Sequence, residues 1–176
     1  MDGRGMKISV LGFSGSGKST LAGALGRRYG VPVLHLDRVQ FAPGWVERPL
    51  DAKVADVQRF LDGHGDGGWV IDGNYAALLQ ERRLEESDRI VILAFGRWTC
   101  LRRVLARYLR YHGRARESMA EGCDEKIDLE FIWWVLHEGR SRSRREALRA
   151  IRDRWTDRTV IIRNQRQLDA FYRSMA

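Results

Sequence analysis

The feature that most constrains the fold is the alternation of short apolar runs with segments of helical periodicity. Five such runs occur at 6–12, 31–37, 69–73, 89–95 and 158–164. Short continuous runs of apolar and β-branched residues are typical of strands buried on both faces of a parallel sheet. The helical patterns between them predict connections that cover the sheet. We therefore expect an α/β fold with a five-stranded parallel sheet flanked by helices.

The length of the chain, 176 residues, suits a single domain, 1–176, with two insertions. The first, at about 38–67, is expected to bind an acceptor. The second, at about 108–155, has no strand candidate and is polar and arginine-rich, so it is predicted to be a helical lid over the sheet's edge. No apolar run approaches the length of a membrane span, and the start lacks a signal-peptide pattern. Cys100 and Cys123 form no metal-ligand spacing, and we expect a cytoplasmic protein without disulfides.

The stretch GFSGSGKST, residues 12–20, follows the first predicted strand and matches GxxxxGK[ST]. Lysine is scarce in this chain, yet Lys18 stands where the motif requires it. Glycines let the backbone wrap a phosphate, and the start of a helix favours anions. The alternative is a glycine turn with an incidental lysine. Lys18 is expected to reach the outer phosphates and Ser19 to ligate Mg²⁺. The predicted nucleotide-binding residues are Gly12, Ser14, Gly15, Ser16, Gly17, Lys18, Ser19 and Thr20.

Two carboxylates follow other predicted strands at the edge where parallel α/β sheets bind ligands. Asp37 ends the second run, where it faces the glycine-rich stretch and is placed to accept a proton from a hydroxyl group. Alternatively it is a helix cap or a surface charge. Asp72 ends the buried run WVID and suits a magnesium ion or its water. Alternatively it forms an Asp-Gly turn. His35 is more simply explained as a packing residue.

Further candidates follow the second, third and fourth runs. Asn74 offers a hydrogen bond and Tyr75 a stacking face for a substrate, and Trp45, in the turn APGW, is a candidate pocket residue. Arg103 and Arg107 lie four residues apart on one face of a predicted helix, where they are placed to clamp phosphates or stabilise a transferring phosphoryl group. The alternative for this pair is a solvated basic face.

Taken together, these motifs resemble the nucleoside monophosphate kinase group of P-loop phosphotransferases, and more closely the bacterial FlaR-like family named "DNA topology modulation protein". The resemblance covers nearly the whole chain. The similar motifs, in order, are GxSGSGKSTLA, HLD, PGW, WVIDGNY, the ER-L pattern at Glu81, Arg82 and Leu84, CLRRVLAR, and EGCDE with DLEFIWW. The first is shared by many P-loop proteins, whereas the later ones are more specific.

The resemblance implies a sheet in the order 2-3-1-4-5, ATP in the glycine-rich loop and a mobile lid. It places Asp72 at the magnesium site, Arg103 and Arg107 among the lid arginines, and Asn164 beside the adenine base. The chain departs from adenylate-type kinases in lacking a proline and an arginine just after Asp-Gly-aromatic. The acceptor therefore need not be a nucleoside monophosphate. Asp37 instead resembles the carboxylate of P-loop kinases that act on hydroxyl groups of small molecules.

These observations favour an ATP-dependent phosphotransferase that uses ATP and Mg²⁺ and transfers the γ-phosphoryl group to an unidentified acceptor. An alternative is a nucleotide-regulated DNA-binding protein, suggested by the family name, the net charge of +8 and the basic segment 97–116. Against it, the sequence has no helix-turn-helix signature, zinc knuckle or aromatic RNA-binding motif. A further alternative is an NTPase without an acceptor. No membrane partner is expected, and the oligomeric state is left open.

Overall fold

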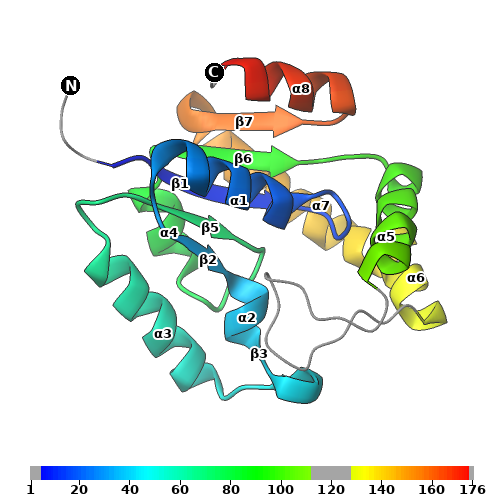
Figure 1. The fold of residues 1–176 in the computed structure, drawn as a ribbon, viewed down its shortest axis with the longest axis horizontal. Helices are drawn as coiled ribbons and strands as arrows, with labels where there is room; N and C mark the ends of the chain where they lie inside the picture. The colour runs from blue at the N-terminus through cyan, green and yellow to red at the C-terminus, as the bar shows by residue number, and fades with distance from the viewer. Residues whose placement is uncertain (1–4, 112–127, 175–176) are drawn as a thin grey trace.

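The computed structural model describes residues 5–111 and 128–174, which form a layered α/β structure (Figure 1). The strands are β1 (Lys7–Gly12), β2 (Val33–His35), β3 (Phe41–Ala42), β4 (Val46–Glu47), β5 (Trp69–Asp72), β6 (Arg89–Leu93) and β7 (Thr159–Ile162). The α-helices are α1 (Lys18–Tyr29), α2 (Leu36–Gln40), α3 (Leu50–Gly63), α4 (Gln80–Glu86), α5 (Arg97–Tyr111), α6 (Leu129–Leu136), α7 (Arg142–Arg154) and α8 (Gln165–Ser174). Short 3-10 helices occupy Pro43–Trp45, Glu138–Arg140 and Thr156–Arg158.

The main sheet has five parallel strands in the order β2-β5-β1-β6-β7. The central strands β1, β5 and β6 are almost entirely buried because helices cover both faces of the sheet. Their sequences are correspondingly apolar from end to end. The expected α/β fold with a five-stranded parallel sheet is confirmed.

With the strands numbered along the chain, the observed order of the main sheet is 2-5-1-6-7, which differs from the expected order 2-3-1-4-5. The numbers 3 and 4 belong to a separate antiparallel pair, β3 and β4, which the sequence analysis did not predict. Each of these strands has two residues, too few to produce an apolar run or a visible alternation. The strands of the main sheet are those of the five predicted runs.

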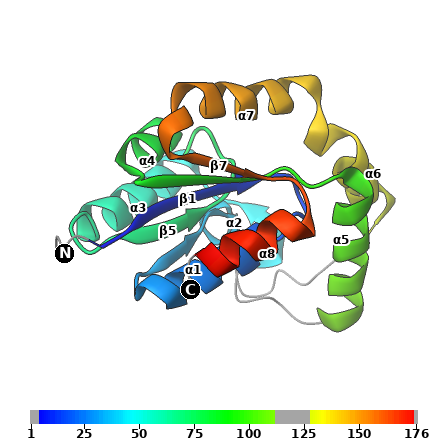
Figure 2. The ribbon, with the colours of Figure 1, turned by 90° about the horizontal axis from the view of Figure 1, so that it is seen from above.

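One face of the sheet is covered by α1 and α8, as Figure 2 shows. Leu21 and Leu25 of α1 and Phe171 of α8 join a cluster with Val10 and Val91 of the sheet. α1 ends at Gly30, whose left-handed φ of 64° closes the helix with a bond from its N–H to the carbonyl oxygen of Gly26. Gly30 is therefore the C-cap of α1.

The opposite face is covered by α3, α4 and α7 (Figure 2). Leu61 of α3 packs against Trp69 of β5, whereas Ile151 and Trp155 pack with Ile92 of β6. The sequence assigns 108–155 to a lid, but the part that forms α7 belongs to this covering layer because its apolar residues meet the sheet. Residues 112–127 of that predicted insertion lie outside the described part of the chain.

The second predicted strand ends earlier than its apolar run. β2 stops at His35, and Leu36–Gln40 form the short helix α2. Leu36 and Val39 of α2 are buried in the cluster with Trp69, so Leu36, which was predicted to lie in a strand, packs from a helix instead. Asp37 consequently lies in the first turn of α2 rather than at the end of a strand.

No helix in the described ranges is both long enough and apolar enough to cross a bilayer. Cys100, in α5, is a buried free thiol. Cys123 lies outside the described residues.

Candidate functional site

The loop between β1 and α1 depends on glycine at three positions. Gly12, Gly15 and Gly17 have φ values of 142°, 74° and 96°, which side chains rarely adopt. A Cβ on Gly12 would lie 2.3 Å from the carbonyl oxygen of Leu93. A Cβ on Gly15 would lie 2.7 Å from the carbonyl oxygen of Cys100. The loop therefore lies closely packed between β6 and α5, and side chains at Gly12 and Gly15 would not fit without a shift of the backbone.

The polar groups of this loop suit an anionic ligand. α1 begins at Lys18 without a side-chain cap and without an acidic residue in its first turn, so no carboxylate of the helix itself neutralises its positive end. The hydroxyl of Ser16 is buried, and no hydrogen-bond partner for it lies among the described residues. Such an orphaned hydroxyl beside an open helix start fits a phosphate group.

Lys18 bonds within the loop and lies near the two candidate carboxylates. Its ammonium donates to the carbonyl oxygen of Phe13 over 3.2 Å. Burial lowers the pKa of Lys18, whereas the nearby charges of Asp37 and Asp72 raise it. Residues from the ends of β1, β2 and β5 therefore meet at one edge of the sheet. Of the other predicted loop residues, Ser14 and Ser19 are half-buried and Thr20 is exposed.

Asn74 lies against the loop rather than in an open pocket. Its Oδ1 accepts from the N–H of Gly12 over 3.0 Å, and its Nδ2 donates to the carbonyl oxygen of Gly12 over 2.6 Å. The amide thus pairs with both backbone groups of the residue that ends β1. Its expected contact with a substrate stays a prediction, but the structure gives Asn74 the role of aligning Gly12.

Asp72 and Asp37 have different partners. Asp72, buried at the end of β5, lies 2.6 Å from Nδ1 of His35. His35 is therefore paired at the site rather than packed in the apolar core. Asp37 accepts a 2.7 Å hydrogen bond from the hydroxyl of Tyr75. Burial is the main cause of the raised pKa of Tyr75, and Asp37 raises it further.

Arg103 of α5 links the loop to the start of α8. Its Nη1 donates to the carbonyl oxygen of Ser16 and its Nη2 to Oε1 of Gln165, each over 2.6 Å. Its guanidinium also stacks 4.0 Å from the ring centre of Phe95. Burial lowers the pKa of Arg103. Arg107 is near enough to Lys18 for its charge to lower the pKa of that lysine, so both predicted arginines of α5 are at the loop.

The remaining predicted residues lie apart from this cluster. Oδ1 of Asn164 accepts from the N–H of Gln167 over 2.9 Å, which is a helix cap for α8. Its expected contact with an adenine base is untested. Trp45 is 37% exposed on the 3-10 helix between β3 and β4, and its ring packs edge-on against Phe41 at 5.4 Å.

Arg140, which was not among the predicted site residues, also supports the loop. Its Nη1 donates to the carbonyl oxygen of Phe95, its Nη2 lies 2.8 Å from Sγ of Cys100, and its guanidinium lies 4.2 Å from the ring of Phe13. Burial lowers the pKa of Arg140 and raises that of the Cys100 thiol. No sequence signal distinguishes this arginine from the many others around it.

Arg83 was also missed, although it is fully buried in α4. It donates to the carbonyl oxygens of Leu78 and Tyr75, each over 2.8 Å, and burial lowers its pKa to about 10. Among the described residues, its Nη1 has no hydrogen-bond partner. The guanidinium therefore fixes the turn that carries Tyr75 toward Asp37.

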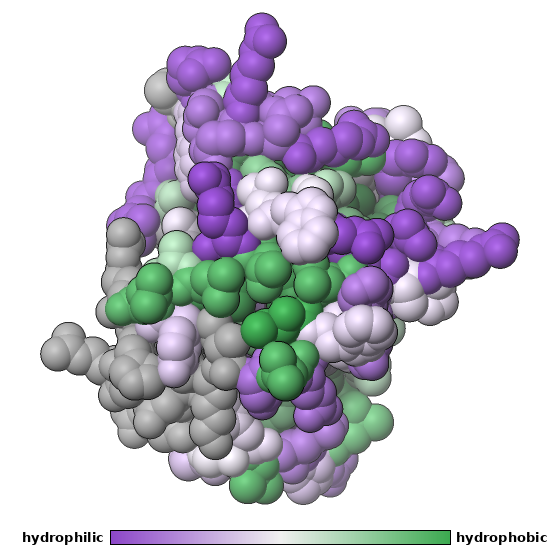
Figure 3. Space-filling model, turned by 90° about the vertical axis from the view of Figure 1, so that its right-hand side faces the viewer, coloured by the Kyte–Doolittle hydropathy of each residue, from purple (hydrophilic) through white to green (hydrophobic). Residues whose placement is uncertain are grey.

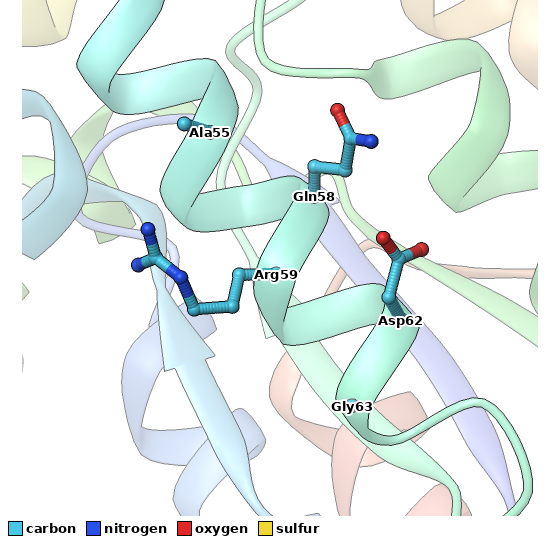
Figure 4. A pocket seen from close by; sticks show the side chains of 5 residues that line it. All are labelled: Ala55, Gln58, Arg59, Asp62 and Gly63. Atoms are coloured by element: carbon cyan, nitrogen blue, oxygen red, sulfur yellow. The ribbon is translucent and has the colours of Figure 1, made fainter.

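Two surface features lie outside the cluster. A shallow hollow on one side of α3 is shown in Figure 4, and it is lined by Ala55, Gln58, Arg59, Asp62 and Gly63. All of its lining comes from one helix, and none of the candidate residues belongs to it. Figure 3 shows a band of hydrophobic side chains on the face formed by α5 and α6. The exposed large residues of these helices are Trp98, Leu105, Leu109, Leu129 and Trp133.

Within residues 5–111 and 128–174 there is no group of three or more His, Cys, Asp or Glu side chains suited to hold a metal ion. A magnesium ion that is coordinated by nucleotide phosphates needs only one or two protein ligands, because waters and phosphate oxygens supply the other ligands. Asp72 and Ser19 are residue types that can supply these one or two ligands. Asp72 stands at the end of β5 and Ser19 at the end of the loop.

Solved structures that are similar to this chain include one that matches along nearly its whole length. No family model matches the chain, and no curated protein matches it. The chain is similar to the crystal structure of an uncharacterized protein from Eubacterium ventriosum ATCC 27560, with 13% sequence identity, coverage of 98% of each chain and a TM-score of 0.47. This level of similarity assigns no activity, so the proposals below depend on the side chains of this chain.

Proposed function

We propose that this protein is an ATP-dependent phosphotransferase of the P-loop kinase type. The observation that carries the proposal is the position of two carboxylates beside the glycine loop: Asp72 lies opposite Val10 of β1 in the sheet, and the charges of Asp37 and Asp72 both raise the pKa of Lys18. The loop supplies a helix start without a side-chain cap, and the buried hydroxyl of Ser16 has no hydrogen-bond partner within residues 5–111 and 128–174. A cation, an anion cradle and two carboxylates within one cluster are the parts that phosphoryl transfer needs.

The proposed roles follow from these positions. The backbone of the 12–18 loop and Lys18 bind the phosphates of ATP, and Lys18 and Arg107 neutralise charge on the group in transfer. Arg103 acts on the loop by holding the carbonyl oxygen of Ser16. Ser19 and Asp72 would hold Mg²⁺, which supplies countercharge for the phosphates when bound.

Asp37 is the proposed general base on the acceptor side. The Tyr75 hydroxyl occupies one of its oxygens and so fixes the orientation of the carboxylate. A base must lie within hydrogen-bond reach of the proton that it removes, and a fixed carboxylate meets that condition better than a mobile one. Asn74 contributes by aligning Gly12 at the start of the loop.

The proposal is tested by the binding of ATP with Mg²⁺ to Lys18→Ala, measured by titration calorimetry. We expect the affinity to fall roughly 30- to 100-fold, because a charged contact to the phosphates is lost. Lys7→Ala is the matched control, since Lys7 lies at the opposite end of β1 and pairs with Glu86 at 3.8 Å. Equal binding by the parent and the Lys18 variant, or no binding by the parent, would refute the proposed function.

A further inference from the structure

His35 and Asp72 meet at the ends of two neighbouring strands. β2 and β5 run parallel, and His35 is the register partner of Asp72, as Leu34 is of Ile71. Because side chains alternate between the two faces of a strand, register partners lie on the same face of the sheet. Nδ1 of His35 thereby comes within 2.6 Å of Oδ1 of Asp72, across 37 residues of sequence. The register of the sheet therefore creates this pair.

The direction of the hydrogen bond follows from the chemistry of the two groups. An ionised carboxylate has no proton to donate, so Nδ1 of His35 is the donor and Oδ1 of Asp72 is the acceptor. The side chain of Asp72 is 5% exposed and that of His35 is 15% exposed, so little water competes for the bond. Hydrogen bonds to a charged acceptor are shorter and stronger than those between neutral groups. The bond therefore fixes the rotation of the carboxylate.

The backbone just beyond the pair is held as well. The N–H of Gly73 donates over 3.1 Å to the carbonyl oxygen of Val10, which ties the residue after Asp72 to β1. Gly73 has a φ of 135°, and a Cβ there would lie 2.8 Å from Cβ of Leu36, the residue after His35. The two segments are in close contact, so the pair cannot separate without a shift of the backbone.

Lys18 and Asp72 carry opposite charges beside the glycine loop, and each is bonded to a different group of the protein. Lys18 donates over 3.2 Å to the carbonyl oxygen of Phe13, whereas Asp72 accepts from His35 through Oδ1. The other carboxylate oxygen of Asp72, Oδ2, takes no part in the bond to His35. Carboxylates that ligate a metal are themselves hydrogen-bonded to outer partners, which set the direction of the ligating oxygen.

We propose that His35 is a positioning residue of the magnesium site, which holds Asp72 by Oδ1 and leaves Oδ2 for Mg²⁺ or for one of its waters. This inference rests on the proposed function, in which Asp72 is a metal ligand. It gives a role to a histidine that the sequence explains more simply as a packing residue. Because His35 acts through Asp72, its loss should weaken binding of the metal-bound nucleotide and spare binding of the nucleotide alone.

The test compares ATP binding in Mg²⁺ with ATP binding in EDTA, measured by titration calorimetry. His35→Leu keeps an apolar side chain of similar size and removes the donor. We expect its ATP affinity in Mg²⁺ to fall about 10- to 100-fold, as when an outer partner of a metal ligand is lost. Its affinity in EDTA should match that of the parent, which also shows that its loop is intact. Equal losses in the two solutions, no loss in Mg²⁺, or a parent that binds ATP equally in both overturns the inference.

His35→Asn is the conservative variant. The amide nitrogen of its side chain is bonded to Cγ, as Nδ1 of histidine is, so it can donate to Asp72 from nearly the same place. We expect it to restore most of the affinity that His35→Leu loses in Mg²⁺, and a failure to do so counts against the inference. His64→Leu is the control, since Nδ1 of His64 donates over 2.8 Å to the carbonyl oxygen of Phe60 at the end of α3. This variant should bind ATP as the parent does.

A double-mutant cycle tests whether His35 acts through Asp72. In Asp72→Asn the proposed metal ligand is already lost, so the addition of His35→Leu should lower the affinity in Mg²⁺ no further. Additive losses would show that His35 acts on another group, and the inference would be wrong.

These outcomes differ from those that refute the proposed function. The proposed function fails if the parent does not bind ATP, or binds it independently of Lys18. If binding depends on Lys18 but His35→Leu weakens it equally in Mg²⁺ and in EDTA, the proposed function stands. His35 is then a structural partner of Asp72 and does not position it for a metal.

Discussion

Gly15 shows how closely the candidate site is packed against its surroundings. Its φ is 74°, and a Cβ there would lie 2.7 Å from both the carbonyl oxygen of Cys100 and Cγ2 of Val104. Both obstacles belong to α5, whose backbone cannot move without disturbing Arg103 in the next turn. The glycine loop is therefore shaped partly by a helix that lies far from it in the sequence.

Gly15→Ala is expected to destabilise the protein by about 1–3 kcal/mol, since it adds a clash to an unfavourable φ. Gly23→Ala is the matched control inside α1, where the new Cβ would meet only the flexible end of Arg27 at 3.5 Å. That substitution should stabilise the protein by roughly 0.5–1 kcal/mol. Urea denaturation measures both free energies of unfolding. Equal effects at the two positions would contradict the close packing of the loop on α5.

The arginines at the site divide into two that the sequence predicts and two that it does not. Arg103 and Arg107 are predicted site residues because they lie four residues apart in a helix that follows a strand. Both lie at the glycine loop. Arg83 and Arg140 were not selected, because a sequence rich in arginine gives no reason to choose them. Arg83 is buried and bonds the 75–79 turn, whereas Arg140 stacks on Phe13. Neither contact is indicated by the residues next to these arginines in the sequence.

At the scale of elements, polar contacts join the hairpin of β3 and β4 to α3: Lys53 of α3 bonds Glu47, and Arg48, which follows β4, bonds Asp56 of α3. Nζ of Lys53 donates to Oε1 of Gln40 at 3.1 Å and to Oε1 of Glu47 at 2.7 Å, and Nε2 of Gln40 donates to the same Glu47 oxygen. These bonds keep the pKa of Glu47 below its usual 4.5. The hairpin has little buried apolar surface of its own, so its order depends on this polar junction.

Lys53→Ala should loosen the hairpin while it leaves the sheet intact. We expect the amides of residues 41–47 to exchange with solvent roughly tenfold faster, as measured by hydrogen exchange and mass spectrometry. Acidification should act in the same direction. The contribution of Glu47 is complete above its usual pKa and is lost as the pH falls through the lowered value.

Lys7→Ala is the control for this experiment, because its 3.8 Å pair with Glu86 lies at another edge of the structure. It should leave exchange at 41–47 unchanged. Faster exchange across the main sheet in the Lys53 variant would show that the junction supports more than the hairpin, and our account of it would be wrong.

At the scale of the whole molecule, both faces of one sheet are covered by separate apolar clusters. Leu25 of α1 belongs to the cluster on one face, and Leu61 of α3 belongs to a cluster on the other. Both side chains are fully buried. Because the same strands contribute to both faces, loss of packing on either side removes support from a shared sheet.

Leu25→Ala and Leu61→Ala are therefore each expected to lower the free energy of unfolding by about 2–5 kcal/mol, in one cooperative transition. Circular dichroism and tryptophan fluorescence should report coincident unfolding curves. Leu109→Ala, at a side chain that is 81% exposed, should change stability by less than about 0.5 kcal/mol. Separate transitions for the two cluster variants would contradict a single cooperative domain.

The sequence by itself determined the class of fold, the strands of the main sheet and the place of the glycine loop. These depend on apolar periodicity and residue spacing, which are read within a few neighbouring residues. The tertiary structure decided which side chains meet. Asn74 bonds Gly12 across 62 residues, Arg103 reaches Ser16 across 87, and Tyr75 reaches Asp37 across 38. Such pairings depend on how the strands are ordered and how their ends come together, and no local pattern carries that information.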